Sequence, residues 1–257
     1  MIELNKIYNE DCLEGMKRIP DKSVDMILCD LPYGTTACKW DTIIPFEPLW
    51  EQYERVIKDN GAIVLTAAQP FTSALVMSNP KIFKYEWIWS KNLPTGFAVA
   101  NRQPMRAHEN ILVFYKKQPT YNKQPTESKI KDRKLGGSNG MRATSKKGGV
   151  YGKLVANNEE IMLKSNVSPR TVLDIACVPR ATGTIHPTQK PVALFEYLIK
   201  TYTNEGETVL DNCMGSGTTA IACMNTGRNF IGFELDETYF DLANERITSH
   251  IDSLEHN

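Results

Sequence analysis

The sequence predicts an α/β fold with a mostly parallel, twisted sheet and helices on both faces. Short runs that are apolar and rich in β-branched or aromatic residues are typical of buried strands. Segments with the spacing of amphipathic helices lie between several of these runs, and strands that alternate with helices form mainly parallel sheets covered on both sides. The predicted strands are 23–29, 61–67, 85–90, 110–115, 207–212 and 229–234.

Three segments have the helical spacing. Residues 45–61 are expected to form a helix that ends at Gly61, because glycine readily adopts the conformation of a C-terminal cap. The other helices are expected within 190–203 and 236–254, and Asp236 is a candidate N-cap of the last. The expected apolar faces comprise Leu49, Trp50, Tyr53, Val56 and Ile57 in the first, Val192, Phe195, Leu198, Ile199 and Tyr202 in the second, and Phe240, Ala243, Ile247 and Ile251 in the third.

Length and composition indicate a globular protein without a membrane segment. The 257 residues suffice for one large α/β domain with an insertion, or for two small domains. No run of about 18 apolar residues occurs, and the N-terminus lacks the apolar core of a secretory signal. The six cysteines form no CxxC pair, so we expect free thiols in a cytoplasmic protein and no metal site.

The net charge is zero, but the basic residues are concentrated in one part of the chain. Residues 116–180 contain 14 Lys and Arg against 5 Asp and Glu, which leaves 16 against 25 elsewhere. The segment 117–184 is also rich in Gly, Asn, Ser and Thr and has weak periodicity, as in a flexible insertion or a small domain ordered by a partner. It separates two halves of the α/β domain, 1–116 and 185–257. A chain that is neutral overall can thus present a basic surface to a polyanion.

An acidic, rigid and aromatic sequence, Asp30-Leu31-Pro32-Tyr33, follows the predicted strand 23–29. A strand and an ordinary turn would explain it. A carboxylate and an aromatic ring at this position could instead face a ligand, because open α/β sheets bind ligands at the carboxyl ends of their strands.

A glycine-rich turn follows the predicted strand that ends at Asp211. Gly215-Ser216-Gly217 is expected to form the turn and Thr218-Thr219 to open a helix, and the next strand ends at Glu234, 19 residues after Gly215. Glycines let the backbone approach a ligand, and the acid can accept hydrogen bonds from ribose hydroxyls. The turn alone also fits a nicotinamide- or flavin-binding oxidoreductase, or a turn needed only for helix–strand packing. It lacks the Lys of a phosphate-binding P-loop.

Three motifs, in this chain order, resemble those of the amino-methyltransferases of DNA: DLPY (30–33), HPTQKP (186–191) and LDNCMGSGTT (210–219). Their order is that of the β-class, and the resemblance covers nearly the whole chain outside 117–184. It implies a Rossmann-like sheet with circularly permuted methyltransferase topology, S-adenosylmethionine as cofactor and double-stranded DNA as partner. A homodimer is compatible with it, because dimers occur in this class.

The same resemblance implies where the cofactor binds. The glycine turn would pass beside its methionine part, Asp211 would support the turn or face the amino group, and Glu234 would accept from the ribose hydroxyls. Asp11 would face the adenine amino group, and Cys12 would supply a backbone contact. The remaining residues implied in cofactor binding are Thr188 and Lys190, for the carboxylate, and Gly215, Ser216, Gly217, Thr218 and Thr219 in the turn.

For catalysis, the resemblance implies that the Asp30 carboxylate and the Leu31 carbonyl accept the two N–H groups of the target amine. Pro32 would stiffen the turn and Tyr33 would stack on a base flipped out of the duplex. Methyl transfer would be a direct in-line displacement that depends on positioning and electrostatics. Asp30 favours adenine N6, since the cytosine-N4 enzymes more often carry Ser there, and cytosine-N4 methylation is the alternative. The chain departs from the family pattern at Leu31, Asn212 and Cys213, where Pro, Pro and Phe are common.

The basic segment 117–184 is the expected target-recognition region, because Lys and Arg neutralise DNA phosphates. Arg102 and Arg106 add two cations between predicted strands. The loop 34–41 is either a lid over the pocket or an ordinary surface loop. A restriction–modification system, a phage or a solitary regulator are all compatible with the sequence. The basic residues expected to include phosphate contacts are Lys129, Lys131, Arg133, Lys134, Arg142, Lys146 and Lys147.

Overall fold

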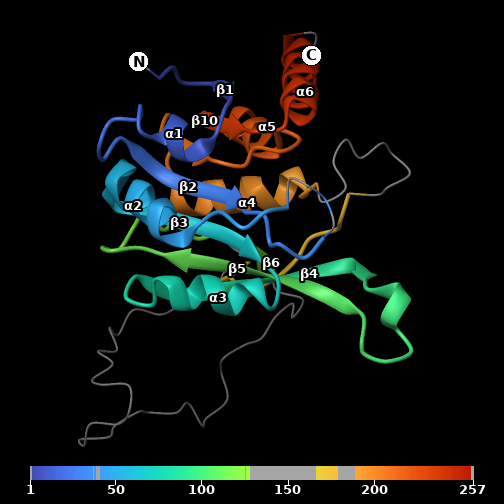
Figure 1. Ribbon diagram of the computed structural model, residues 1–257. Helices are drawn as coiled ribbons and strands as arrows, with labels where there is room; N and C mark the ends of the chain where they lie inside the picture. The colour runs from blue at the N-terminus through green and yellow to red at the C-terminus, as the bar shows by residue number, and fades with distance from the viewer. Residues whose placement is uncertain are drawn as a thin grey trace, which may run out of the picture. The chain divides into compact units, whose positions relative to one another are not determined.

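An eight-stranded sheet forms the centre of the protein in the computed structural model, which describes residues 2–36, 38, 41–124, 126–127, 166–178 and 189–255. The strand order is β1-β10-β9-β2-β3-β5-β4-β8 (Figure 1). All pairings are parallel except those of β5, which runs antiparallel to both of its neighbours. The strands are β1 (Lys6–Asn9), β2 (Val24–Asp30), β3 (Ile57–Ala67), β4 (Phe83–Thr95), β5 (Arg106–Phe114), β8 (Val172–Asp174), β9 (Thr208–Asp211) and β10 (Asn229–Glu234).

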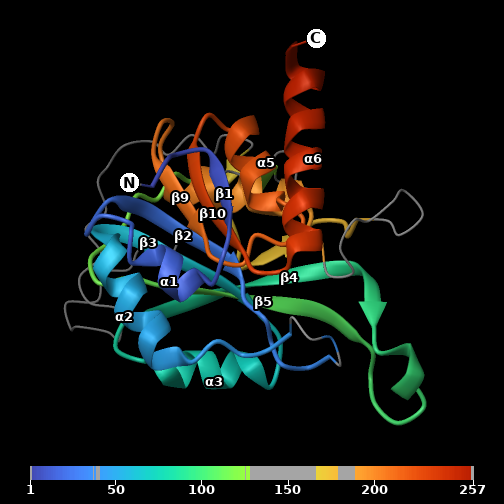
Figure 2. The same cartoon turned by 45° about the horizontal axis from the view of Figure 1, so that its top comes forward.

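Helices cover both faces of the sheet (Figures 1 and 2). Strand β2 shows why, because its apolar side chains alternate between two cores: Met26 and Leu28 belong to one, Ile27 and Cys29 to the other. The predicted α/β class, a mostly parallel sheet with helices on both faces, is therefore confirmed. Helices α1 (Cys12–Met16), α2 (Phe46–Val56) and α3 (Phe71–Ser78) pack on one face, and α4 (Val192–Tyr202), α5 (Thr218–Asn225) and α6 (Glu237–Glu255) on the other.

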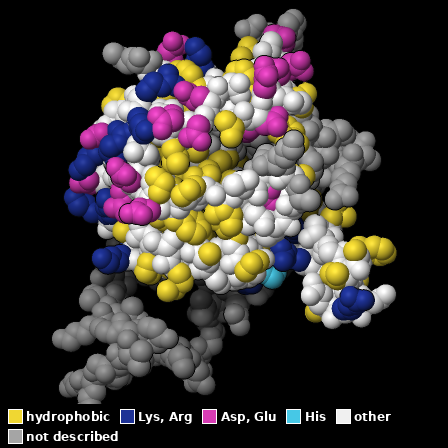
Figure 3. All heavy atoms as spheres, viewed as in Figure 1, with side chains coloured by type: hydrophobic (Ala, Val, Ile, Leu, Met, Phe, Trp, Pro, Cys, Tyr) yellow, Lys and Arg dark blue, Asp and Glu magenta, His cyan; other side chains and the backbone are white. Residues whose placement is uncertain are grey.

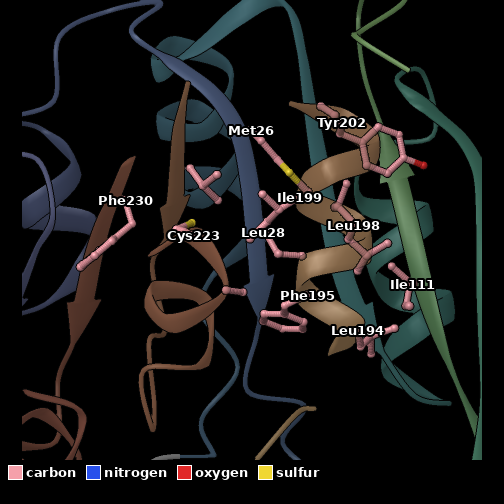
Figure 4. Close-up of a cluster of buried hydrophobic side chains, with 14 of the residues drawn as sticks. Met26, Leu28, Ile111, Leu194, Phe195, Leu198, Ile199, Tyr202, Cys223 and Phe230 are labelled. Atoms are coloured by element: carbon pink, nitrogen blue, oxygen red, sulfur yellow. The ribbon is translucent and has the colours of Figure 1, made fainter. Parts of the chain in front are cut away.

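Helix α4 shows how the predicted amphipathic spacing becomes a buried face. Leu194, Phe195, Leu198 and Ile199 point from one side of α4 into the core beside β2 and β5 (Figure 4), and each is at most 2% exposed. Each fully buried side chain of this size contributes about 1.5–3 kcal/mol of transfer free energy. This burial fixes α4, and the residues just before it, against the carboxyl ends of the strands.

The predicted C-cap at Gly61 is wrong. Helix α2 ends at Val56, and Ile57 is already extended and begins β3. Gly61 lies inside β3, where an added Cβ would come within 2.7 Å of the Asp25 carbonyl oxygen. Glycine here permits close approach of β3 to β2 rather than the end of a helix.

Several elements were not predicted or extend beyond their predicted bounds. Strand β1 and helices α1 and α3 have too few periodic residues to stand out from single-sequence patterns. Strands β4 and β5 continue past the apolar runs as a long hairpin, with the short 3-10 helix η1 (Phe97–Val99) between them. Figures 1 and 2 show this hairpin extending beyond the rest of the sheet.

The chain divides into one unit of residues 1–122 and 170–257 and a second unit of residues 123–169. In the second unit, β6 (Thr126–Glu127) pairs antiparallel with β7 (Asn166–Val167). The predicted insertion 117–184 is wider than this unit, because β8 pairs with β4 in the main sheet. The seven basic residues expected to include phosphate contacts lie outside the described residues. Within the described residues, no helix combines the length and apolarity needed to cross a membrane.

Candidate active site

The sheet has its topological switch point between β2 and β9. The chain passes from β2 to β3 on one side and from β9 to β10 on the other, although β2 and β9 are hydrogen-bonded neighbours. Open α/β sheets bind ligands at the carboxyl ends of the strands at such a point. Asp30, Asp211 and Glu234 are the last residues of β2, β9 and β10, and all three line one cavity of about 1250 Å³.

This cavity gathers most of the residues that the sequence motifs indicated. The glycine turn, the Asp30–Tyr33 sequence and Lys190 are far apart in the chain and meet on its wall. Gly217 is not on the wall, and Thr188 lies outside the described residues. The predicted residues that line the cavity are Asp11, Cys12, Asp30, Leu31, Pro32, Tyr33, Lys190, Asp211, Gly215, Ser216, Thr218, Thr219 and Glu234.

The Asp30 carboxylate is held by three neighbours. Its Oδ1 atom accepts hydrogen bonds from the Thr66 hydroxyl and, at 2.7 Å, from the Tyr33 hydroxyl. Its Oδ2 atom lies 2.5 Å from the Lys190 Nζ. Burial, followed by the nearby Asp30 charge, raises the pKa of Tyr33 well above its usual value, so the phenol stays a donor. The carboxylate is thereby fixed in orientation at the end of β2.

The Tyr33 ring is supported from one side by Phe71 of α3. The two ring centroids are 5.3 Å apart with an interplanar angle of 25°, a stacked arrangement. The Leu31 side chain is only 3% exposed and packs in the core with α2 and α3 residues, so its backbone is anchored. An aromatic plate beside a fixed carboxylate is suited to holding a planar ring that carries an N–H donor.

Asp41 organises the loop that follows Tyr33. The backbone N–H groups of Gly34, Thr35 and Thr36 donate to its carboxylate at 2.8, 2.9 and 2.6 Å. Burial would raise the pKa of Asp41, but hydrogen bonds from Thr36 and this backbone lower it overall. The backbone at the start of the 34–41 loop is therefore held by a carboxylate at the end of the same loop. The small polar residues of the loop did not predict this arrangement. Trp40 lies outside the described residues.

Lys190 belongs to a buried ion-pair network. Its ammonium group contacts Asp30 at 2.5 Å and Glu109 Oε2 at 3.4 Å, while Glu109 Oε1 accepts a hydrogen bond from Lys91 at 2.9 Å. Glu109 and Lys91 line the cavity and were not singled out in the sequence. Lys190 was predicted to bind the cofactor carboxylate. Its ammonium group instead faces the two protein carboxylates, so this geometry does not support that role.

The glycine turn after β9 is joined to the end of β10. Gly215 has φ of +53° and donates its backbone N–H to Glu234 Oε2 at 2.7 Å, and Asp236 N–H donates to Glu234 Oε1 at 2.9 Å. Burial raises the pKa of Glu234, and these backbone donors oppose that shift. Gly217, with φ of +75°, instead packs against α6, where an added Cβ would lie 3.3 Å from the Ala243 Cβ. Gly215 thus serves the cavity and Gly217 the helix packing.

Asp211 supports the same turn from below. Its carboxylate accepts hydrogen bonds from the Cys213 N–H, at 3.0 Å, and from the Thr219 hydroxyl, and its side chain is almost completely buried. Burial raises the pKa of Asp211 to about 6. This geometry corresponds to the first of the two expected roles of Asp211, support of the loop.

The other wall of the cavity begins at Asp11 and Cys12. Asp11 caps α1 by accepting from the Leu13 N–H at 2.8 Å, which also fixes its carboxylate at the cavity edge. The Cys12 thiol contacts the Asn212 amide at 3.5 Å, and the Tyr53 hydroxyl donates to Asn212 Oδ1 at 2.5 Å. Asn212 therefore tethers the two cofactor-side motifs through a polar contact where the family often has proline. No cluster of His, Cys, Asp or Glu suited to a metal ion occurs in the described residues.

Comparisons with known protein sequences all point to DNA methyltransferases. A family of DNA methylases, the N6/N4 type, matches residues 24–245. The Type II methyltransferase M1.MboII of Moraxella bovis is 31% identical over 95% of this chain and 96% of its own length. M.HpaI of Haemophilus parainfluenzae is 26% identical over 97% of this chain and 76% of its own length.

Solved structures agree with this class. The M1.HpyAVI–SAM complex aligns with a TM-score of 0.62 at 26% identity, covering 94% of this chain and 98% of that one. The cytosine-N4-specific PvuII DNA methyltransferase aligns with a TM-score of 0.65 over 96% of this chain and 91% of that one, and at 15% identity it shows the fold alone.

The chain belongs to the N6/N4 DNA methylase family, the amino-methyltransferases of DNA. Nothing in the comparisons supports the oxidoreductase alternative.

Proposed function

We propose that the protein methylates the exocyclic N6 of adenine in double-stranded DNA. The observation that carries the proposal is the Asp30 carboxylate, fixed by Thr66 and Tyr33 on the wall of a cavity that also contains the glycine turn. A carboxylate of this kind accepts an amine N–H, and Asp at this position favours adenine over cytosine. The homodimer remains a prediction.

S-adenosylmethionine is the cofactor, and the cavity wall fits it. An added Cβ at Gly215 would find no heavy atom closer than 4.0 Å, so the bare backbone leaves room beside the turn. Glu234 retains acceptor capacity for ribose hydroxyls, because a carboxylate offers about four lone-pair sites and two backbone N–H groups use only part of them. S-adenosylmethionine supplies an electrophilic methyl group when bound.

The protein's contribution to transfer is to position the amine. The exocyclic nitrogen is a poor nucleophile while its lone pair is delocalised into the ring. Two acceptors, the Asp30 carboxylate and the Leu31 carbonyl, would draw its N–H groups out of the ring plane and direct the lone pair toward the methyl group. Tyr33, backed by Phe71, would stack on the flipped base, a contact worth roughly 1–3 kcal/mol.

The β4–β5 hairpin is the surface that we infer contacts DNA beside the cavity. Residues 92–108 contain two arginines and one histidine and no acidic residue. Leu93 and Phe97 line the cavity rim and are 51% and 85% exposed. Figure 3 shows hydrophobic and basic side chains together on this projecting hairpin. Cations that contact phosphates, with an apolar side chain that can insert between bases, are the elements by which proteins hold a distorted duplex.

Product analysis tests the proposed function. DNA from cells that express the protein is compared by single-molecule sequencing with DNA from cells that carry an Asp30→Ala variant, which gives the modified base and its sequence context together. N6-methyladenine only in the first sample is the expected result, and N4-methylcytosine alone would refute the choice of base. Because the named relatives are Type II methyltransferases, we expect one short recognition sequence, as in a restriction–modification system.

A further inference from the structure

The Lys190 ammonium group occupies the place that a target amine is expected to take. It lies 2.5 Å from Asp30 Oδ2 and 5.7 Å from the centroid of the Tyr33 ring. Phe71 stacks on the Tyr33 ring, and the ammonium group lies near the same ring, which is the one that would receive a base. An N–H donor against Asp30 and close to Tyr33 has the same two partners that the exocyclic amine of a stacked base would have.

This arrangement is largely buried. The Lys190 side chain is 6% exposed, and those of Asp30 and Glu109 are 21% and 15% exposed. Burial would lower the pKa of Lys190, but the charges of Asp30 and Glu109 more than offset this and raise it. A buried ammonium group that loses its partner leaves an uncompensated charge, which is strongly destabilising. Lys190 can therefore leave Asp30 only if another acceptor is within reach.

Glu109 provides such an acceptor. Its Oε2 atom is buried and lies 3.4 Å from the Lys190 Nζ, a long ion-pair contact that does not reach good hydrogen-bond geometry. Its Oε1 atom is already bound by Lys91. Burial would raise the pKa of Glu109, but Lys190 and Lys91 lower it overall, so it remains a carboxylate at neutral pH. A buried acceptor atom without a hydrogen bond calls for an explanation.

We propose that Lys190 is a positioning residue that occupies Asp30 in the DNA-free enzyme and transfers its hydrogen bond to Glu109 Oε2 when the target amine reaches Asp30. The inference rests on the proposed function, because it needs an amine that binds Asp30. The exchange leaves no buried charge without a partner. Asp30 keeps its bonds from Thr66 and Tyr33 and passes from the ammonium donor to the neutral amine N–H, while Lys190 stays paired with Glu109, whose Oε2 atom gains a hydrogen bond. A cation held near Asp30 also keeps the carboxylate preformed before the base arrives.

Two variants, one single and one double, test the exchange, with the DNA sequence that the wild-type enzyme methylates as substrate. Glu109→Gln removes the second carboxylate and leaves Lys190 on Asp30, so the KM for DNA should rise about tenfold, within the range of couplings measured between contacting residues. Lys190→Met combined with Glu109→Gln removes the competing donor and should reverse most of that rise. Affinity for S-adenosylmethionine, titrated without DNA, should change less than about twofold, because Glu109 is assigned no cofactor contact.

Lys58→Met is the matched control, because Lys58 forms an ion pair with Asp25 at 2.6 Å away from the cavity. It should leave the KM for DNA unchanged. Equal KM values for wild type and Glu109→Gln, or no relief in the double variant, would overturn the exchange. A parallel loss of thermal stability and of cofactor affinity in Glu109→Gln would show a merely structural role and also overturn it. Absence of methyl transfer by the wild-type enzyme would instead refute the proposed function.

Discussion

Glu234 accepts the backbone N–H of Gly215 at 2.7 Å, so the end of β10 fixes the turn that follows β9. One carboxylate thereby shapes the backbone on one side of the cavity while keeping acceptor sites for a ligand on the other. Gly215 forms this bond in the left-handed region, with φ of +53°, where most side chains are strained.

The Gly215→Val variant should lose most of its affinity for S-adenosylmethionine. A β-branched residue at positive φ costs on the order of 1–3 kcal/mol in strain, and its side chain would also occupy the open space beside the turn. Gly206→Val is the matched control, since Gly206 has φ of +80° and nothing within 4 Å of an added Cβ, but does not line the cavity. Titration calorimetry should show weak binding for the first variant only. Equal affinities would show that the cofactor does not pass along this turn.

Asp30→Ala should reduce methyl transfer while leaving cofactor binding largely intact. Loss of one oriented polar group in an active site typically costs about 10²–10³ in kcat, and Asp30 is the side chain that we propose orients the amine. Asp25→Ala, in the same strand, removes an ion pair with Lys58 of similar length and serves as the control. Single-turnover rates with saturating cofactor measure the effect. Retained turnover in Asp30→Ala would contradict the assigned role.

The strand-end residues could be predicted from the sequence, but their partners could not. Asp30, Asp211 and Glu234 each follow an apolar run, and the carboxyl ends of parallel strands meet at one edge of the sheet. Thr66, by contrast, stands in an ordinary strand sequence. Only the register of β3 beside β2, which pairs Asp30 with Thr66, brings its hydroxyl to the carboxylate.

Glu109 shows a second reason why some residues of the site could not be predicted from the sequence. It belongs to β5, whose antiparallel direction places its first residues, rather than its last, at the carboxyl ends of the neighbouring strands. A search for polar residues after strands therefore passes over it. Strand direction is a property of the assembled sheet, and the sequence pattern of a buried strand is similar in both directions.

Stability should respond to pH through Asp211. Burial raises the pKa of Asp211 from its usual value of 3.8 to about 6, so between these values the folded protein holds a proton that the unfolded chain has released. The resulting stabilisation is present below about pH 4 and is lost as the pH rises to about 6. The free energy of unfolding should fall by about 3 kcal/mol over this interval. The Asp211→Asn side chain does not titrate, so this variant does not lose that stabilisation as the pH rises.

The measurement is the free energy of unfolding of both proteins from pH 4 to pH 7. The variant should gain stability relative to the wild type across this interval. Glu109, whose pKa is lowered overall by its lysine partners, acts in the opposite direction but equally in both proteins, so the difference reports Asp211. Parallel curves would show that the Asp211 carboxyl does not titrate in this range.

The hairpin variants Phe97→Ala and Arg102→Ala should weaken DNA binding in different ways. Arg102 is exposed and would contact phosphate, so its removal should lower the slope of log affinity against log salt concentration by about 1. Phe97, 85% exposed at the cavity rim, would fill space between bases, so its removal should weaken binding at every salt concentration and leave the slope unchanged.

Met77→Ala on α3, where the side chain is 72% exposed and outside the cavity, is the control for loss of an exposed apolar group. Fluorescence anisotropy with labelled duplex at several salt concentrations separates the two effects. Unchanged affinity in both hairpin variants would show that the hairpin does not contact DNA. The cavity would then receive the base without help from this hairpin, and another surface would bind the duplex.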